Sequence, residues 1–202
     1  ASLAKNKTLK TNTLAELSNS IEDKEVGLAV LQEDEQRLLR ILEVAKESQL
    51  QGPTTYEDIK ALRELRGELP MPVVGSIRTQ FGAPREGNAR WRGWVIETNE
   101  DASIRAIGPG QVVYADWLRG YGLMIIVDHQ DGLYSLYAHN GALFFQVGDW
   151  VRSGEVISLA GQPTTPELTD IRGVYLEIRE NGQPVDPKVW IDPNQATNPL
   201  RN

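Results

Sequence analysis

The chain has 202 residues, of which 24% are charged and 40% hydrophobic, and its formal net charge is -7. This negative charge argues against a dedicated nucleic-acid binder and offers no polybasic anchor for an anionic membrane surface. No apolar run reaches the roughly 20 residues that span a bilayer. Because cysteine is absent, disulfides and thiolate metal sites are excluded. The length suits one core-forming domain with an accessory segment.

Residues 9–50 are predicted to form one long helix, since they contain no proline and a single glycine. Most positions of an a/d heptad series are apolar; the series is Leu14, Leu17, Ile21, Lys24, Leu28, Leu31, Glu35, Leu38, Leu42 and Ala45. We therefore expect a coiled-coil segment over 1–51, truncated at its start, whose seam needs a partner helix. The pattern leaves open one alternative, an amphipathic helix packed on the domain's own core.

Residues 52–70 are expected to form a linker that carries a short helix at 56–67. Pro53 ends the long helix, because proline cannot continue it. The apolar face of the short helix is formed by Ile59, Leu62 and Leu65. Two interpretations remain open. The helix is either a strut between the coil and the domain, or an autoinhibitory element that covers a groove and must be displaced.

From residue 71 to residue 191 the hydrophobic period changes to two. The apolar runs are VIET, SIRAI, QVVYADW, LMIIVDH, LYSLYAH, VISLAG and VYLEIRE. Short runs separated by glycine-containing turns are typical of an all-β sandwich or barrel. The polar residues 192–202 are predicted to be a loose tail. The expected fold class is therefore α+β, with N-terminal helices followed by an all-β domain.

Five segments of this β region carry a family resemblance. They are RWRGWVIE (90–97), ADWLRGYGLMIIVDH (115–129), SLYAHN (135–140), VGDWVRSGEVISLAG (147–161) and YLEIRENGQPVDPKVW (175–190). Together they resemble the degenerate LytM domains of murein hydrolase activators. The resemblance implies a lysostaphin-type peptidase fold, of the duplicated hybrid motif-like kind, over residues 71–191.

Zinc-binding members of this family carry their ligands in the motifs H-x-G-x-D and H-x-H-F-E-I-R. In this chain Trp91 and Val95 stand at the ligand positions of the first motif, and Gly173 and Tyr175 replace the histidines of the second. The whole chain has two histidines, whereas a catalytic zinc site uses three protein ligands. We therefore expect no metal, no cofactor and no hydrolase activity.

A scaffold that keeps its shape without its ligands suggests a groove used for binding. The expected partner-binding residues are Trp91, Arg92, Val95, Tyr121, His139, Tyr175 and Arg179. Trp91, Val95 and Tyr175 form an apolar floor that suits a hydrophobic helix. The arginines flank this floor and can pair with acidic residues. Tyr121 is expected as an exposed aromatic residue at the groove edge, and His139 as part of its wall.

The resemblance implies a non-catalytic activator of zinc N-acetylmuramoyl-L-alanine amidases, acting in cell division and daughter-cell separation. It places the protein in the periplasm of a Gram-negative bacterium. It also implies that the coiled coil engages the FtsEX complex, through segments outside this chain. Three alternatives remain: a zinc endopeptidase with an unusual ligand set, a peptidoglycan-binding module without activator role, and a structural coupler.

Overall fold

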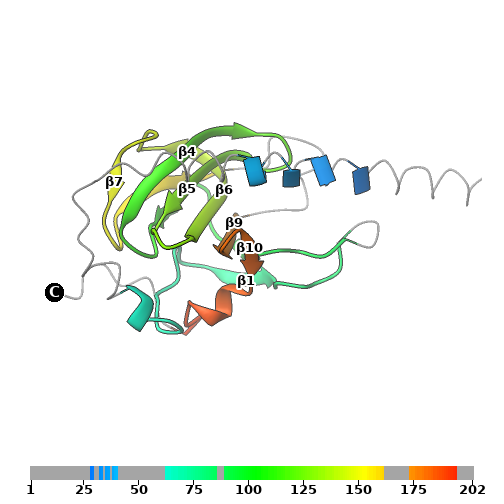
Figure 1. Cartoon of the computed structure of the whole chain (residues 1–202), viewed down its shortest axis with the longest axis horizontal. Coiled ribbons are helices and arrows are strands. Elements are labelled where there is room, and N and C mark those ends of the chain that lie inside the picture. The colour runs from blue at the N-terminus through cyan, green and yellow to red at the C-terminus, as the bar shows by residue number, and fades with distance from the viewer. Residues whose placement is uncertain are drawn as a thin grey trace, which may run out of the picture.

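The computed structural model describes residues 28–29, 32–33, 35–36, 38–40, 62–85, 89–161 and 173–194. Most of this part of the chain is β-structure, as Figure 1 shows. The strands are β1 (Ser76–Thr79), β2 (Trp94–Glu97), β3 (Ser103–Arg105), β4 (Gly110–Leu118), β5 (Gly122–Asp128), β6 (Leu133–Leu143), β7 (Trp150–Val151), β8 (Val156–Ala160), β9 (Val174–Glu180) and β10 (Gln183–Val185). A 3-10 helix, η2 (Pro187–Val189), follows them. Within the described residues, no helix is long and apolar enough to cross a membrane.

The strands form one sheet in the order β1-β2-β9-β6-β5-β4-β7, with β10 added to β9 and a β3–β8 pair joined to β6. Each of the seven apolar runs expected as a strand contains one, so the prediction of an all-β domain is confirmed. The strands β1, β7 and β10 were not expected, because strands of two to four residues are too short to show a period of two.

Alternate residues of the central strands enter two separate apolar clusters. On β2, Trp94 and Ile96 join the main core, whereas Val95 joins a second cluster on the other face of the sheet. On β9, Leu176 belongs to the main core and Tyr175 to the second cluster. This follows from the alternation of side chains along a strand. We call the second cluster the groove cluster.

The groove cluster is covered by residues from the N-terminal part of the chain. The described residues between 28 and 40, which we call the covering segment, are helical. Within it, Leu38 is fully buried and packs in the groove cluster. The described seam positions of the predicted coiled coil therefore face this domain and not a separate helix, which matches the alternative left open by the heptad pattern. Its other positions lie outside the described residues.

The described residues of the short helix expected at 56–67 do not lie on the groove. Figure 1 shows its described helical residues, 62–64, on the opposite side of the domain from the covering segment. Leu62 is buried in the main core, where its Cδ1 lies 2.5 Å from the place a Cβ on Gly108 would take. Leu65 is exposed, and Ile59 lies outside the described residues. For its described residues, the position of Leu62 in the main core agrees with the strut interpretation and not with a helix that covers the groove.

Candidate partner-binding groove

The floor of the groove is built by the pairing of β2 with β9. Val95 stands opposite Tyr175 in the antiparallel register, and both side chains are buried in the groove cluster. Three rings surround the Tyr175 ring: those of Trp91, Tyr121 and His139, with centroids at 5.9, 5.7 and 6.1 Å. The structure thus brings together the predicted floor residues in one aromatic and aliphatic surface.

Trp91 forms one rim of the groove on the loop before β2. Its backbone N–H donates to the Ala83 carbonyl, and its carbonyl accepts from Gly82, which fixes the loop. The Arg85 guanidinium lies over the indole ring, 4.3 Å from the ring centroid. Such a stacked cation strengthens the contact without needing a carboxylate. Arg85 is a groove residue that the sequence did not indicate.

Tyr121 and His139 form the opposite wall, and Tyr121 is less exposed than expected. Tyr121 occupies the turn between β4 and β5, where Gly120 and Gly122 adopt positive φ angles. Its carbonyl accepts from the backbone N–H of His139 at 3.1 Å, which joins the two residues. The Tyr121 side chain packs against the groove cluster, so the prediction of an exposed aromatic edge is corrected.

Burial sets the protonation states of this wall. Desolvation lowers the pKa of His139 to about 4, helped by the nearby Arg85 and opposed by a hydrogen bond with the Gly173 backbone. Desolvation also raises the pKa of the Tyr121 hydroxyl, with a further contribution from the Glu177 carboxylate. Both side chains are therefore neutral at pH 7. His139 also has a φ of 63°, an uncommon backbone conformation for a residue other than glycine.

Beneath the floor lies a buried charged triad on β9, formed by Tyr175, Glu177 and Arg179. These residues share one face of the strand. The Tyr175 hydroxyl donates to Glu177 Oε2 at 2.6 Å, and Arg179 Nε donates to Glu177 Oε1 at 2.5 Å. Burial raises the pKa of the Glu177 carboxyl, and the Arg179 charge opposes this rise. The Glu177 and Arg179 side chains have no exposed area, so each needs the opposite charge of the other to compensate its loss of solvation.

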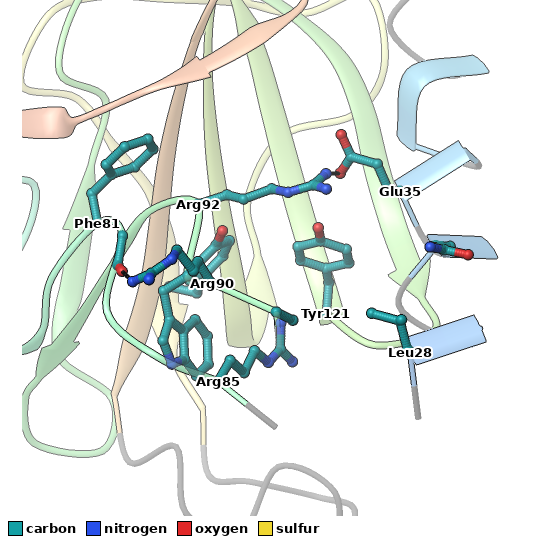
Figure 2. Close-up of a pocket in the computed structure, with 12 residues that line it drawn as sticks. Leu28, Glu35, Phe81, Arg85, Arg90, Arg92 and Tyr121 are labelled. Atoms are coloured by element: carbon teal, nitrogen blue, oxygen red, sulfur yellow. Dashed lines mark hydrogen bonds and ion pairs between the residues drawn. The ribbon is translucent and has the colours of Figure 1, made fainter. Parts of the chain in front are cut away.

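Glu35 of the covering segment completes this charged network. Its Oε1 accepts from Arg179 Nη2 at 2.7 Å, and its Oε2 pairs with the Arg92 guanidinium. Figure 2 shows Glu35 reaching from the helical segment toward Arg92, above the Tyr121 ring. In this network, the positive charges of Arg92 and Arg179 are matched by the negative charges of Glu35 and Glu177. Without Glu35 this network would keep two guanidinium groups against the single carboxylate of Glu177, and Arg85 adds a further positive charge to the groove.

The covering segment does not fill the groove completely. A cavity of about 440 Å³ remains between the segment and the domain. Leu28, Gln32 and Glu35 line it from the segment, and Trp91, Tyr121 and Tyr175 are among the residues that line it from the domain. Among the described residues of the segment, the main contacts with the groove are the Glu35 ion pairs and the buried Leu38 side chain.

The residues present do not fit the zinc site that the fold family implies. Trp91 and Val95 offer no metal-binding atom, and the Tyr175 hydroxyl is engaged by Glu177. Gly173 has a φ of 123°, and a Cβ there would collide with the Ile96 carbonyl oxygen. A histidine therefore cannot replace this glycine without a change in the backbone. Within the described ranges, no three His, Cys, Asp or Glu side chains gather as a metal site requires.

Besides Arg85, two further functional candidates were missed at the level of sequence, for different reasons. Glu177 alternates with Tyr175 and Arg179 in the run VYLEIRE, so a search for buried charges on one strand face would have found it. Glu35 was recognised only as an interruption of an apolar seam. Its partner Arg179 lies 144 positions away, and no local pattern reports such a contact.

Comparison with known proteins agrees with the fold and with the resemblance. Residues 89–187 match the model of Peptidase family M23. The chain is 33% identical over 185 residues to the murein hydrolase activator EnvC of Escherichia coli K12, which covers 87% of this chain and 43% of that protein. It is 35% identical over 121 residues to the murein hydrolase activator NlpD of the same organism, covering 59% and 30%.

Solved structures show the same fold. The catalytic domain of lysostaphin from Staphylococcus simulans superimposes with a TM-score of 0.50 at 20% sequence identity, and the match covers 64% of this chain and 93% of that domain. The chain spans less than half the length of the curated relatives described above. Residues 89–187 of the chain therefore match Peptidase family M23, and the chain is similar to murein hydrolase activators.

Proposed function

We propose that this protein is a non-catalytic activator of zinc N-acetylmuramoyl-L-alanine amidases, and that it binds the amidase through the groove cluster and its flanking arginines. The observation that carries this proposal is that the groove already holds a helical segment, with Leu38 buried and Glu35 paired to Arg92 and Arg179. A groove that seats a helix of its own chain has the shape and charge to seat a helix of another protein. Two relatives named murein hydrolase activators support the same function.

The absence of zinc-ligand side chains supports a non-catalytic role. The four positions that hold ligands in zinc-binding relatives carry Trp91, Val95, Gly173 and Tyr175. Three of these side chains serve the floor, and Gly173 is required by the backbone. In this account the amidase supplies the zinc and the bond cleavage. The groove of this protein supplies a binding surface that favours the active conformation of the amidase.

We infer that the covering segment is the autoinhibitory element. The chain then has two states, one with the segment seated and one with the groove free for the amidase. Activation requires a difference in affinity between these states, since a partner that binds both equally shifts neither. Burial of a leucine stabilises the closed state, in which the segment occupies the groove, by roughly 2 kcal/mol. A few contacts of this size can therefore set the equilibrium between the closed and the open state.

The proposed cellular setting is the periplasm of a Gram-negative bacterium, at the site of cell division. There the FtsEX complex would act on the N-terminal region that the sequence predicts to be a coiled coil, which includes the covering segment. Because Glu35 and Leu38 belong to that region, a displacement of the helix would withdraw both contacts together. This link between a helix and a groove provides a physical route from a division signal to an amidase.

The proposal is tested by release of dye from labelled peptidoglycan with a purified zinc amidase of this type. The domain should be produced from residue 52, because Leu62 and Leu69 belong to the main core. This fragment lacks the covering segment and should stimulate the amidase more strongly than the full chain. The same fragment with Tyr175→Ala should not stimulate. Absence of stimulation by the unsubstituted, folded fragment would refute the activator function.

A further inference from the structure

The contacts of the covering segment define a pattern that a ligand of this groove must match. Leu28, Glu35 and Leu38 stand at spacings of seven and three, which place them on one helix face. Leu38 is fully buried and the Glu35 side chain is 15% exposed, whereas Leu28 lines the cavity but is 37% exposed. Residues of the other faces, such as Glu33 and Leu39, are exposed. Among the described residues of the segment, the Glu35 carboxylate and the Leu38 side chain therefore make the closest contacts with the groove.

The groove binds the carboxylate through a guanidinium that is held in place. Arg179 Nε donates to Glu177, and Nη1 donates to the Gly182 carbonyl at 3.1 Å. Nη2 is the nitrogen that points to the covering segment, where it meets Glu35. Because the Arg179 side chain is fully buried, loss of Glu35 without replacement would leave Nη2 short of a partner. A ligand with a carboxylate at this position would accept the hydrogen bond from Arg179 Nη2.

A neutral or basic ligand is disfavoured for the same reason. Arg92 and Arg179 bring two positive charges to the mouth of the groove, and Glu177 neutralises one of them. The exposed Arg92 extends the positive region toward solvent. The site where Leu38 sits is apolar, since Val95, Met124 and Leu136 are among its neighbours in the groove cluster. The positively charged site and the apolar site of the groove therefore lie about one helical turn apart.

From this geometry we propose that the partner element is an amphipathic helix that carries an acidic residue and, three residues later, a leucine or a similar apolar residue. This helix takes the places of Glu35 and Leu38, so that partner and covering segment exclude one another. The inference rests on the proposed function, which it deepens by stating the chemistry that the groove selects in its amidase.

The binding preference is tested without any amidase. A labelled peptide of residues 25–44 with blocked ends serves as the probe, and the receptor is the full chain carrying Glu35→Gln and Leu38→Ala. A circular dichroism spectrum that matches the wild-type chain confirms that the receptor is folded. The peptide should bind this receptor, whereas the wild-type chain should bind it at least about tenfold more weakly, because its own segment competes.

Two peptide variants separate the pattern from non-specific apolar binding. Glu35→Gln in the peptide should weaken binding about tenfold, since the amide can accept a hydrogen bond but loses the ion pairs with Arg92 and Arg179. Glu33→Gln removes one negative charge from an exposed position and should leave binding unchanged. Equal affinity of the unsubstituted and Glu35→Gln peptides would overturn the proposed preference for an acidic helix.

A second arm distinguishes this inference from the proposed function. The full chain carrying Glu35→Gln and Leu38→Ala is mixed with amidase and labelled peptidoglycan, and the residue 25–44 peptide is added. The inference predicts that the peptide suppresses stimulation and that its Glu35→Gln form does so much less. Stimulation that persists with saturating peptide would refute mutual exclusion while the activator function stands. Glu35-dependent peptide binding without any stimulation would refute the activator function while the groove preference stands.

Discussion

Glu35 and Arg179, which lie 144 positions apart in the chain, are joined by a charge-assisted hydrogen bond of 2.7 Å across the groove. Although burial alone would lower it, the carboxylates of Glu177 and Glu35 hold the pKa of the Arg179 guanidinium above its ordinary value. Arg179 therefore keeps its charge in both states of the groove. When the covering segment leaves, Glu177 remains to pair with it. Departure of the segment therefore leaves the Arg179 charge paired, although it uncovers the apolar site where Leu38 packs.

The pairing of Arg179 with Glu177 determines how each can be substituted. Arg179→Ala should lower the free energy of unfolding by about 3–5 kcal/mol, because it leaves a buried carboxylate without its partner. Adding Glu177→Gln should recover most of this loss. Urea denaturation of the two variants measures the difference. If the double variant is no more stable than Arg179→Ala, Glu177 is not the group that the arginine compensates.

Loss of stimulation by Arg179→Ala alone would therefore be a poor test of binding, since instability would give the same result. Arg92→Ala is a better choice because the Arg92 side chain is 44% exposed and lies at the groove mouth.

The docking of the covering segment in the groove is predicted to depend on Leu38. Leu38→Ala should increase the rate of limited proteolysis between residues 28 and 40 in the full chain, because the segment loses roughly 2–5 kcal/mol of packing. The matched control is Leu39→Ala, since Leu39 is 40% exposed. Cleavage is followed by mass spectrometry. Equal cleavage rates in the two variants would show that Leu38 does not anchor the segment.

Gly173 is predicted to be irreplaceable for a backbone reason. Gly173→Ala should destabilise the domain by several kcal/mol, because its φ of 123° is strained for other residues and a Cβ would meet the Ile96 carbonyl. Gly182→Ala is the control, since Gly182 also has a positive φ but no atom within 4 Å of the place a Cβ would take. Gly182→Ala should cost only about 1 kcal/mol. Thermal denaturation of both variants decides whether the close approach matters.

The buried His129 is predicted to make stability depend on pH. Desolvation lowers its pKa to about 4, while its ring nitrogens lie 2.7 Å from the Pro109 carbonyl and the Ser135 hydroxyl. The unfolded chain takes up this proton near pH 6.5 and the folded chain only near pH 4. The contribution is therefore fully present above pH 6.5 and is lost as the pH falls to about 4.

The size of this effect is isolated by comparing the wild-type chain with His129→Gln. Urea unfolding at several pH values should show that their stability difference shrinks by about 3 kcal/mol between pH 7 and pH 4. A difference that stays constant over this range would mean that His129 does not titrate as described.

The β domain could be predicted from the sequence because its signals are local. Alternating apolar runs mark the strands, and the two motifs around Trp91 and Tyr175 indicate which residues meet at the groove floor. The structure pairs Val95 with Tyr175 as this prediction requires. The expected clustering of the seven groove residues is thus observed, whereas their role in partner binding stays a prediction.

The position of the covering segment could not be predicted in the same way. A heptad pattern shows that one face of a helix is apolar, but it does not show what that face contacts. Leu28, Glu35 and Leu38 satisfy a coiled-coil seam and a groove equally well. Leu62 has a similar ambiguity, since an amphipathic turn fits either a groove or the core. Only the long-range contacts with Arg179 and Gly108 distinguish the alternatives.

The central claim is that the groove activates an amidase and that the covering segment holds it closed. The most direct measurement is amidase-dependent dye release by the full chain carrying Glu35→Gln and Leu38→Ala, compared with the wild-type chain and with Glu33→Gln. Stimulation should rise at least about tenfold in the first variant, because each change weakens the closed state by more than about 1 kcal/mol. Glu33→Gln should behave as wild type. Equal stimulation by all three folded chains would contradict the account.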